Sequence, residues 1–172
     1  GINYEAQILD IYQQNSYGRA IIYGKEIRDW QVNFFGSKKK KEKLAIKNYQ
    51  NLNGCVTFVD IKLIEASLFA KDSKCEDAIN LVRTKGNINK IEISNSLYDG
   101  LDIDFSSLSI NEISVNNSMN DCVDLSFGDY EINNSKLSNC GDKGISIGEK
   151  SYVRLNSIKV LNVNTGIASK DS

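Results

Sequence analysis

The chain has 172 residues, and its 21 basic and 22 acidic side chains leave a net charge of −1 at pH 7. Neither nucleic acid nor an anionic membrane surface is an expected partner, since both attract an excess of positive charge. The absence of His excludes Ser-His-Asp and Cys-His catalytic groups within the chain. No apolar run approaches the roughly 20 residues of a transmembrane helix, so no membrane span is expected.

Residues 1–53 are predicted to form irregular coils. The runs 8–12, 20–23 and 30–35 are short, rich in β-branched or aromatic residues and bounded by glycines, which is typical of strands. For the first run, an amphipathic helix over residues 4–13 that caps the fold is the alternative. A Lys-rich loop follows at residues 36–50; we interpret it as a solvated excursion between two coils, with polyanion binding as the alternative.

The rest of the chain, residues 54–172, repeats a short pattern every 22 residues, in which a small residue precedes an apolar, a polar and an apolar residue. The small residues of successive repeats are Ala78, Gly100, Cys122, Gly144 and Gly166. Each repeat contains three short alternating stretches, which in one repeat are 101–103, 108–110 and 113–115. This fixed period predicts an all-β fold: a parallel β-helix of about 22 residues per coil, read as one domain.

The two ends of the sequence bear on its context. It starts at Gly1 and stops at Ser172, just after a repeat and without a capping element. We therefore interpret it as a fragment of a longer chain. An uncapped end would expose unpaired strand edges, which favour stacking on the rest of that chain or on another subunit.

Asparagine and phenylalanine also recur at the repeat period. Asn tolerates the left-handed backbone of tight turns, and stacked amide side chains can hydrogen-bond from coil to coil. The asparagine columns are Asn95, Asn117 and Asn139, and separately Asn111 and Asn133. Phe105 and Phe127 are one repeat apart and are predicted to stack.

The four cysteines, Cys55, Cys75, Cys122 and Cys140, form no C-x-x-C pair, so a zinc site is not expected. Because Cys122 occupies the small-residue position of its repeat, we predict buried free thiols. A disulfide such as Cys122–Cys140 is the alternative.

Acidic residues gather in neighbouring columns, because coils stacked about 4.8 Å apart turn sequence columns into rows of side chains. The candidate ligand-binding or cation-binding residues are Asp77, Asp99, Asp102, Asp104, Asp121 and Asp124. Repulsion between carboxylates raises the pKa of at least one of them, as a general acid requires. The catalytic candidates are Asp99, Asp121, Asp124 and Lys143, and Ca²⁺ is the expected cation. The alternative is a solvated polar face on which Lys143 neutralises part of the charge.

Repeats that read GLDID, CVDLS and GISIG, with Asn at the turns, resemble the right-handed parallel β-helix superfamily that includes pectate lyases and polygalacturonases. The likeness covers roughly residues 54–172 and concerns the fold rather than an activity. The sequence is also similar to uncharacterised bacterial β-helix repeat proteins of the cell surface.

The polygalacturonase motifs are matched in part. Asp99 stands at the Asp of N-T-D and Asp121 at the second Asp of D-D, whereas Asn120 replaces the family's proton donor. Lys143 occupies the His position of G-H-G, and no R-x-K motif follows it. A pectate-lyase-like reaction would instead use Ca²⁺ held by the aspartates, with Lys143 as the base that removes a proton next to a uronate carboxylate.

From these features we expect a non-catalytic extracellular or cell-surface module, a scaffold or adhesive segment with a polysaccharide or cell-surface glycan as its ligand class. The alternative is a polysaccharide lyase or glycoside hydrolase that acts on an acidic polysaccharide. The missing proton donor and the absence of His favour the module. The carboxylate columns favour the enzyme.

Overall fold

The computed structural model describes residues 1–15, 18–37 and 52–170, and every regular element in these ranges is a strand. The predicted N-terminal strands are confirmed as β2 (Ile8–Tyr12), β3 (Ala20–Tyr23) and β5 (Gln31–Phe35), so the alternative of a capping helix over residues 4–13 is wrong. Within the Lys-rich loop expected at 36–50, residues 38–50 lie outside the described residues. None of the described residues belongs to a helix that is long and apolar enough to cross a membrane.

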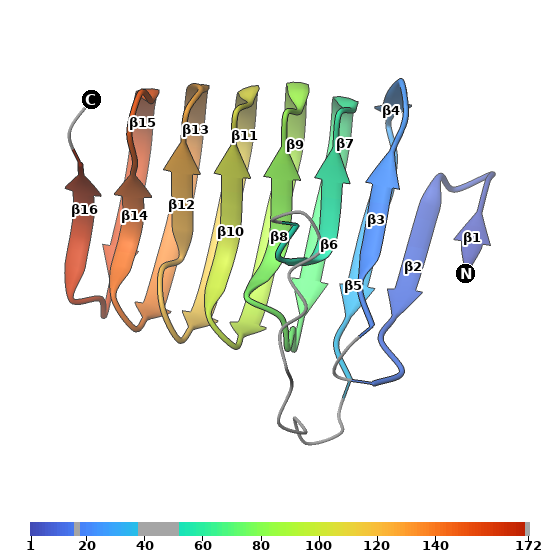
Figure 1. The fold of residues 1–172 in the computed structure, drawn as a ribbon, viewed down its shortest axis with the longest axis horizontal. Helices are drawn as coiled ribbons and strands as arrows, with labels where there is room; N and C mark the ends of the chain where they lie inside the picture. Colours follow the sequence, from blue (N-terminus) through green and yellow to red (C-terminus); the bar gives the residue numbers. More distant parts are fainter. Residues whose placement is uncertain (16–17, 38–51, 171–172) are drawn as a thin grey trace.

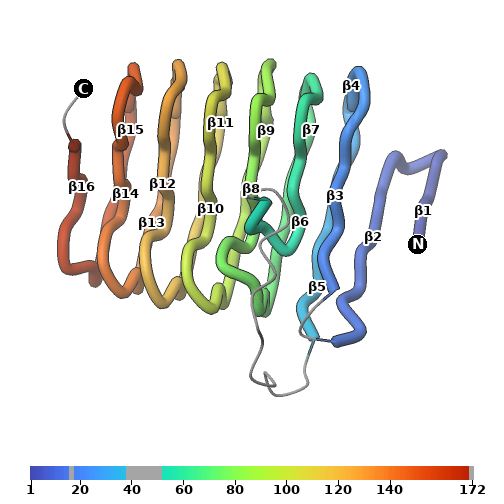
Figure 2. The backbone as a smooth tube through the Cα atoms, in the orientation of Figure 1, coloured from blue at the N-terminus to red at the C-terminus, as the bar shows by residue number. Residues whose placement is uncertain are grey.

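The chain winds into a solenoid whose coils contribute strands to two sheets (Figures 1 and 2). The short-strand sheet consists of β3, β6 (Gly54–Val59), β8 (Asp77–Val82), β10 (Asp99–Asp104), β12 (Val123–Ser126), β14 (Lys143–Ile147) and β16 (Thr165–Ser169). The long-strand sheet consists of β1 (Ile2–Asn3), β2, β4 (Glu26–Arg28), β5, β7 (Lys62–Lys71), β9 (Lys85–Ser96), β11 (Ser107–Ser118), β13 (Asp129–Cys140) and β15 (Tyr152–Leu161).

Strand pairing confirms the parallel β-solenoid. Leu101 lies in register with Ile79 before it and Val123 after it, and both partners are 22 residues away. Coils of 23 residues flank this region, since Val56 pairs with Ile79 and Ile132 with Leu155. In Figure 1 the chain rises through the short-strand sheet, crosses over and descends through the long-strand sheet as it advances, which makes the solenoid right-handed.

The second and third predicted strands of each coil join into one long strand with a bend. In β11 the pairing with both neighbouring strands skips Asn111, and β13 likewise skips Asn133. These asparagines therefore mark the corner between the two halves of the long strand. The Nδ2 group of Asn156 donates to Oδ1 of Asn133 at 2.7 Å, which links two coils at this corner.

The core lies between the two sheets and is filled by the apolar phase of each strand. In β10, Leu101 and Ile103 are fully buried, whereas the intervening Asp102 is half-buried on the outer face. At the small-residue positions the backbone of the next coil is very close: a Cβ atom on Gly100 would lie 2.6 Å from the Cys122 carbonyl oxygen. This close approach is why the period begins with a small residue.

The predicted asparagine column is confirmed at the corner that ends each long strand. Asn95, Asn117 and Asn139 all have positive φ angles, of 59°, 67° and 56°. The Nδ2 group of Asn117 donates to Oδ1 of Asn95 at 2.9 Å, whereas Asn139 donates to Asn116 at 2.8 Å. Each asparagine thus suits the left-handed backbone of its turn, and its side chain hydrogen-bonds to the preceding coil.

We expect Asn117→Ala to lower the free energy of unfolding by about 1–2 kcal/mol, because it removes a hydrogen bond and places a Cβ-bearing residue without polar compensation at positive φ. Asn117→Gly is the control, since glycine accepts this φ freely but makes no side-chain hydrogen bond. Urea unfolding of both variants separates the backbone effect from the hydrogen bond. Equal stability of the wild type and Asn117→Ala would contradict the structural role of the column.

The prediction of free thiols is wrong. The structure contains two disulfides, Cys55–Cys75 and Cys122–Cys140, within coils and with separations of 20 and 18 residues; in the described residues no cysteine is left free. The reason is geometric. Gly100 and Ser118 occupy the corresponding positions one coil earlier, and a Cβ on Gly100 would lie 3.0 Å from Ser118 Oγ. The turn therefore brings the end of each long strand back to its own small-residue position.

Candidate functional site

The predicted acidic residues lie on three adjacent strands of the short-strand sheet and on the turns that precede them. Asp77 pairs in register with Asp99, and Asp102 pairs with Asp124. The structure therefore brings the candidates together as two rows. The first row, at the strand starts, is Asp77, Asp99, Asp121 and Lys143. The second row, on the outer face, is Asp102 and Asp124, and we include in it Asp104, which lies two residues further along β10.

Two carboxylates of the first row, those of Asp99 and Asp121, bind the backbone of the following coil. Oδ1 of Asp99 accepts the N–H of Asp121 at 2.8 Å and the Nδ2 group of Asn120 at 2.7 Å. Oδ1 of Asp121 accepts the N–H of Lys143 at 2.9 Å. Each carboxylate thus satisfies a backbone donor at the start of the next coil, which is a structural function.

Lys143 is the last residue of the first row and forms ion pairs with two carboxylates. Its Nζ atom lies 3.4 Å from Asp121 Oδ1 and also contacts the Asp142 carboxylate. The hydrogen bond to Asp142 raises the pKa of Lys143, and the charge of Asp121 acts in the same direction. A lysine that serves as a base needs the opposite shift, so these contacts oppose the proton abstraction expected of Lys143.

The second row consists of carboxyl groups whose pKa values are raised. Burial raises the pKa of Asp102 to about 8, and repulsion from Asp104 and Asp124 adds to this. Burial also raises the pKa of Asp104 and of Asp124, which the hydroxyl group of Ser146 partly offsets in the case of Asp124. The Nδ2 group of Asn80 donates to Oδ2 of Asp102 at 2.9 Å.

In the first row, the carboxyl groups of Asp77 and Asp99 also have raised pKa values. Asp77 is 3% exposed, and its Oδ2 atom has no hydrogen-bond partner among the described residues. Burial raises its pKa well above the ordinary range, with further contributions from Asp102 and Asp99. Burial raises the pKa of Asp99 to about 6, although its hydrogen bonds from Asp121 and Asn120 act against the shift. The acidic face therefore carries fewer negative charges at neutral pH than its residue count indicates.

These carboxyl groups do not fit the predicted Ca²⁺ site. Ca²⁺ requires several ionised or carbonyl oxygens around one point. One oxygen of Asp99 and one oxygen of Asp121 accept backbone N–H groups, which fixes the directions of these two carboxylates. Across residues 1–15, 18–37 and 52–170, no group of three or more acidic or cysteine side chains has the arrangement of a metal site.

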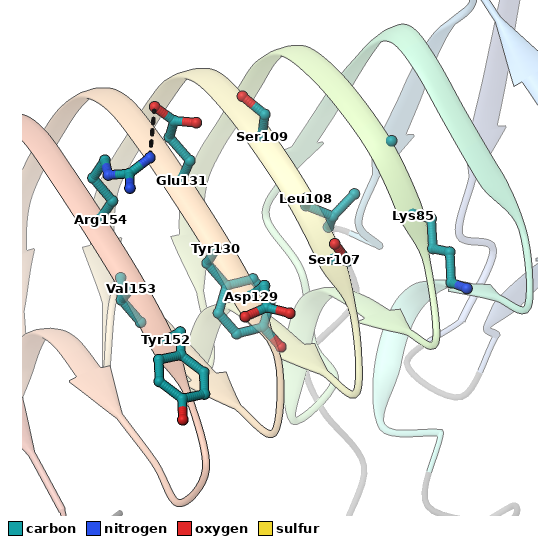
Figure 3. A pocket seen from close by; sticks show the side chains of 11 residues that line it. Lys85, Ser107, Leu108, Ser109, Asp129, Tyr130, Glu131, Tyr152, Val153 and Arg154 are labelled. Atoms are coloured by element: carbon teal, nitrogen blue, oxygen red, sulfur yellow. Dashed lines mark ion pairs between the residues drawn. The ribbon is translucent and has the colours of Figure 1, made fainter.

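A second feature, which the sequence interpretation missed, lies on the outer face of the long-strand sheet. A hollow of about 760 Å³ crosses β9, β11, β13 and β15 near the starts of these strands (Figure 3). Its floor includes Leu108 and Tyr130, and its polar lining is formed by Lys85, Ser107, Ser109, Asp129, Glu131, Tyr152 and Arg154. We call this hollow the corner groove.

The residues of the corner groove come from equivalent positions of successive coils, as Lys85, Ser107, Asp129 and Tyr152 show by pairing in register. Their residue types differ from coil to coil, so the sequence repeat does not reveal the groove. Beside them the predicted Phe105–Phe127 stack is confirmed, with ring centroids 4.8 Å apart and planes inclined by 15°.

Comparison with models of known protein families, with curated proteins and with solved structures gave no match to this chain. The structure therefore shows a parallel β-solenoid, and functional inference rests on the geometry of the two sites.

Proposed function

We propose that this chain is a non-catalytic β-solenoid module of an extracellular or cell-surface protein, with a scaffolding or adhesive role and glycans as its ligand class. One observation carries the proposal. The two carboxylates that match polygalacturonase motifs, Asp99 and Asp121, each accept the first backbone N–H groups of the following coil. Groups committed to backbone hydrogen bonds in the unliganded protein are poorly placed to act as acid, base or nucleophile.

The disulfides support an extracellular location. Disulfides form and persist in oxidising compartments and are rare in the cytosol. This chain forms Cys55–Cys75 and Cys122–Cys140 in coils that are separated by two further turns of the solenoid. Both bonds are buried, since each of the four cysteines is at most 5% exposed.

A polysaccharide lyase or hydrolase remains the second candidate, and one observation favours it. Asp102, with a pKa raised to about 8, pairs in register with Asp124 on the neighbouring strand. A protonated carboxyl group beside a second carboxyl group is the arrangement that glycoside hydrolases use. For this reason the experiment below includes Asp102 among the variants.

The test is incubation of the purified chain, with and without Ca²⁺, with acidic and neutral oligosaccharides, followed by product analysis. We expect no products from any substrate. We expect Asp121→Ala to lower the free energy of unfolding by about 1–3 kcal/mol, because the Lys143 N–H loses its acceptor. Asp121→Asn keeps an oxygen at this position and should recover most of that loss. Products that disappear in Asp121→Asn or Asp102→Asn would overturn the proposal.

A further inference from the structure

The corner groove is bordered by exposed aromatic side chains. Phe105 is 56% exposed, Phe127 37% and Tyr152 78%. A second hollow, of about 300 Å³, is lined by Phe127, Gly128, Asp129, Lys150 and Tyr152, and it shares two of these residues with the corner groove. The aromatic residues and the corner groove therefore form one continuous surface.

Folding alone does not account for the two phenylalanines. Both have φ angles of 51°, a left-handed conformation that is unfavourable for a bulky residue. At the same turn in neighbouring coils, Arg83 and Lys150 have φ angles of 51° and 52°, so these coils make the turn with positive φ as well. The turn therefore does not require an aromatic residue, and two exposed rings at this position point to a use outside the fold.

The charges of the corner groove balance. Glu131 Oε1 lies 3.9 Å from the Arg154 guanidinium, and Asp129 stands between the positions of Lys85 and Tyr152 in its column (Figure 3). Two acidic and two basic groups together with two serine hydroxyls offer many hydrogen bonds without a net charge. Such a lining suits a hydroxyl-rich neutral ligand better than a polyanion.

The direction of the corner groove indicates an extended ligand. It crosses four parallel strands, and strands are about 4.8 Å apart, so it runs for about 14 Å along the solenoid axis. Each strand places one side chain of the same column beside the groove, so a linear polymer lying along the axis would meet a polar or aromatic side chain at every strand.

We propose that the corner groove binds a neutral linear polysaccharide along the solenoid axis, with Tyr152 and the Phe105–Phe127 stack as platforms for the apolar faces of sugar rings. The charged and hydroxyl side chains of the corner groove would hydrogen-bond the sugar hydroxyl groups. This inference rests on the proposed function, since it assigns a ligand class and a place to the proposed glycan recognition.

The test is calorimetric titration of the disulfide-bonded chain with neutral linear hexasaccharides of glucose, xylose and mannose, with oligogalacturonate as the acidic comparison. We expect the wild type to bind a neutral hexasaccharide and Tyr152→Ala to bind it at least tenfold more weakly. Tyr23→Ala is the matched control, since Tyr23 is 77% exposed on β3, in the other sheet. Phe105→Asn and Phe127→Asn should also weaken binding, and because Asn accepts positive φ this gain offsets part of the stability lost with the ring stack.

The inference is overturned if no neutral hexasaccharide binds, if only oligogalacturonate binds, or if Tyr152→Ala and Tyr23→Ala bind equally well. Product analysis of the same samples keeps the two proposals apart. Products would contradict the non-catalytic function whatever the groove binds, whereas absence of both binding and products would leave a structural solenoid without this site.

Discussion

Between pH 5 and pH 8 we expect the protein to become less stable as the pH rises. The cause is the set of carboxyl groups on the short-strand sheet whose pKa values are raised by burial, Asp102 to about 8 and Asp99 to about 6. In the unfolded chain an Asp has a pKa of about 3.9, so between these values the folded state binds more protons than the unfolded state. The stability that these two groups contribute is therefore fully present below about pH 4 and is lost as the pH rises through the folded pKa values.

The size of the effect follows from proton linkage. Each carboxyl group that stays protonated only in the folded state contributes a slope of up to about 1.4 kcal/mol per pH unit. Asp99 contributes to this slope only up to about pH 6, whereas Asp102 contributes up to about pH 8, so most of the loss in this window comes from Asp102. Urea unfolding at three or four pH values in this window measures the slope directly.

The variant Asp102→Asn tests whether Asp102 causes the fall in stability with rising pH. Asp102→Asn removes the ionisable group but keeps an oxygen that can accept the hydrogen bond from Asn80, so it should flatten the pH dependence and stabilise the protein at pH 8. Glu112→Gln is the matched control, because Glu112 is exposed on the opposite sheet. A wild type whose stability is constant or rises from pH 5 to pH 8 would show that these carboxyl groups ionise freely in the folded state.

The fold was predictable from the sequence because each coil repeats the register of the one before. The apolar positions, the close approach at Gly100 and the left-handed turns at Asn95 and Asn117 impose their residue types once in every coil. A 22-residue spacing is therefore a direct record of strand pairing. The 23-residue coils were not predicted, because an added residue at a turn leaves the pattern within each strand unchanged.

The roles of the acidic residues were harder to predict from the sequence than the fold was. The sequence placed Asp99 and Asp121 in one row, but their hydrogen bonds to the N–H groups of Asp121 and Lys143 depend on the turn that aims each carboxylate along the axis. The protonation of Asp102 depends on how deeply its outer-face position is buried. Neither the direction of a carboxylate nor its depth of burial can be derived from the spacing of residues in the sequence.

The corner groove could be recognised only in the structure and not in the sequence. Its columns, at Lys85, Ser107, Asp129 and Tyr152, are irregular in residue type, so the repeat gives no motif there. The exposure of Phe105 and Phe127 was equally hidden, since a recurring Phe normally indicates a core position.

We expect loss of the Cys122–Cys140 disulfide to lower the free energy of unfolding by about 3 kcal/mol. The bond closes a loop of 18 residues, and cross-linking a loop of about this length reduces the entropy of the unfolded chain by roughly that amount. The double variant Cys122→Ala with Cys140→Ser is the appropriate test. Ala78 and Ser118 hold the corresponding positions in other coils, so the new side chains suit the corner.

The strands in which hydrogen exchange increases distinguish the loss of the disulfide from a general loss of packing. A solenoid gains stability coil by coil, so hydrogen exchange should increase first in β12 and β13, which the bond connects. The matching variant Cys55→Ala with Cys75→Ser should affect β6 and its neighbours instead. Reduced wild-type protein should match the variant that lacks both bonds. If Cys122→Ala with Cys140→Ser unfolds at the same urea concentration as the oxidised wild type, the corner is held by packing alone.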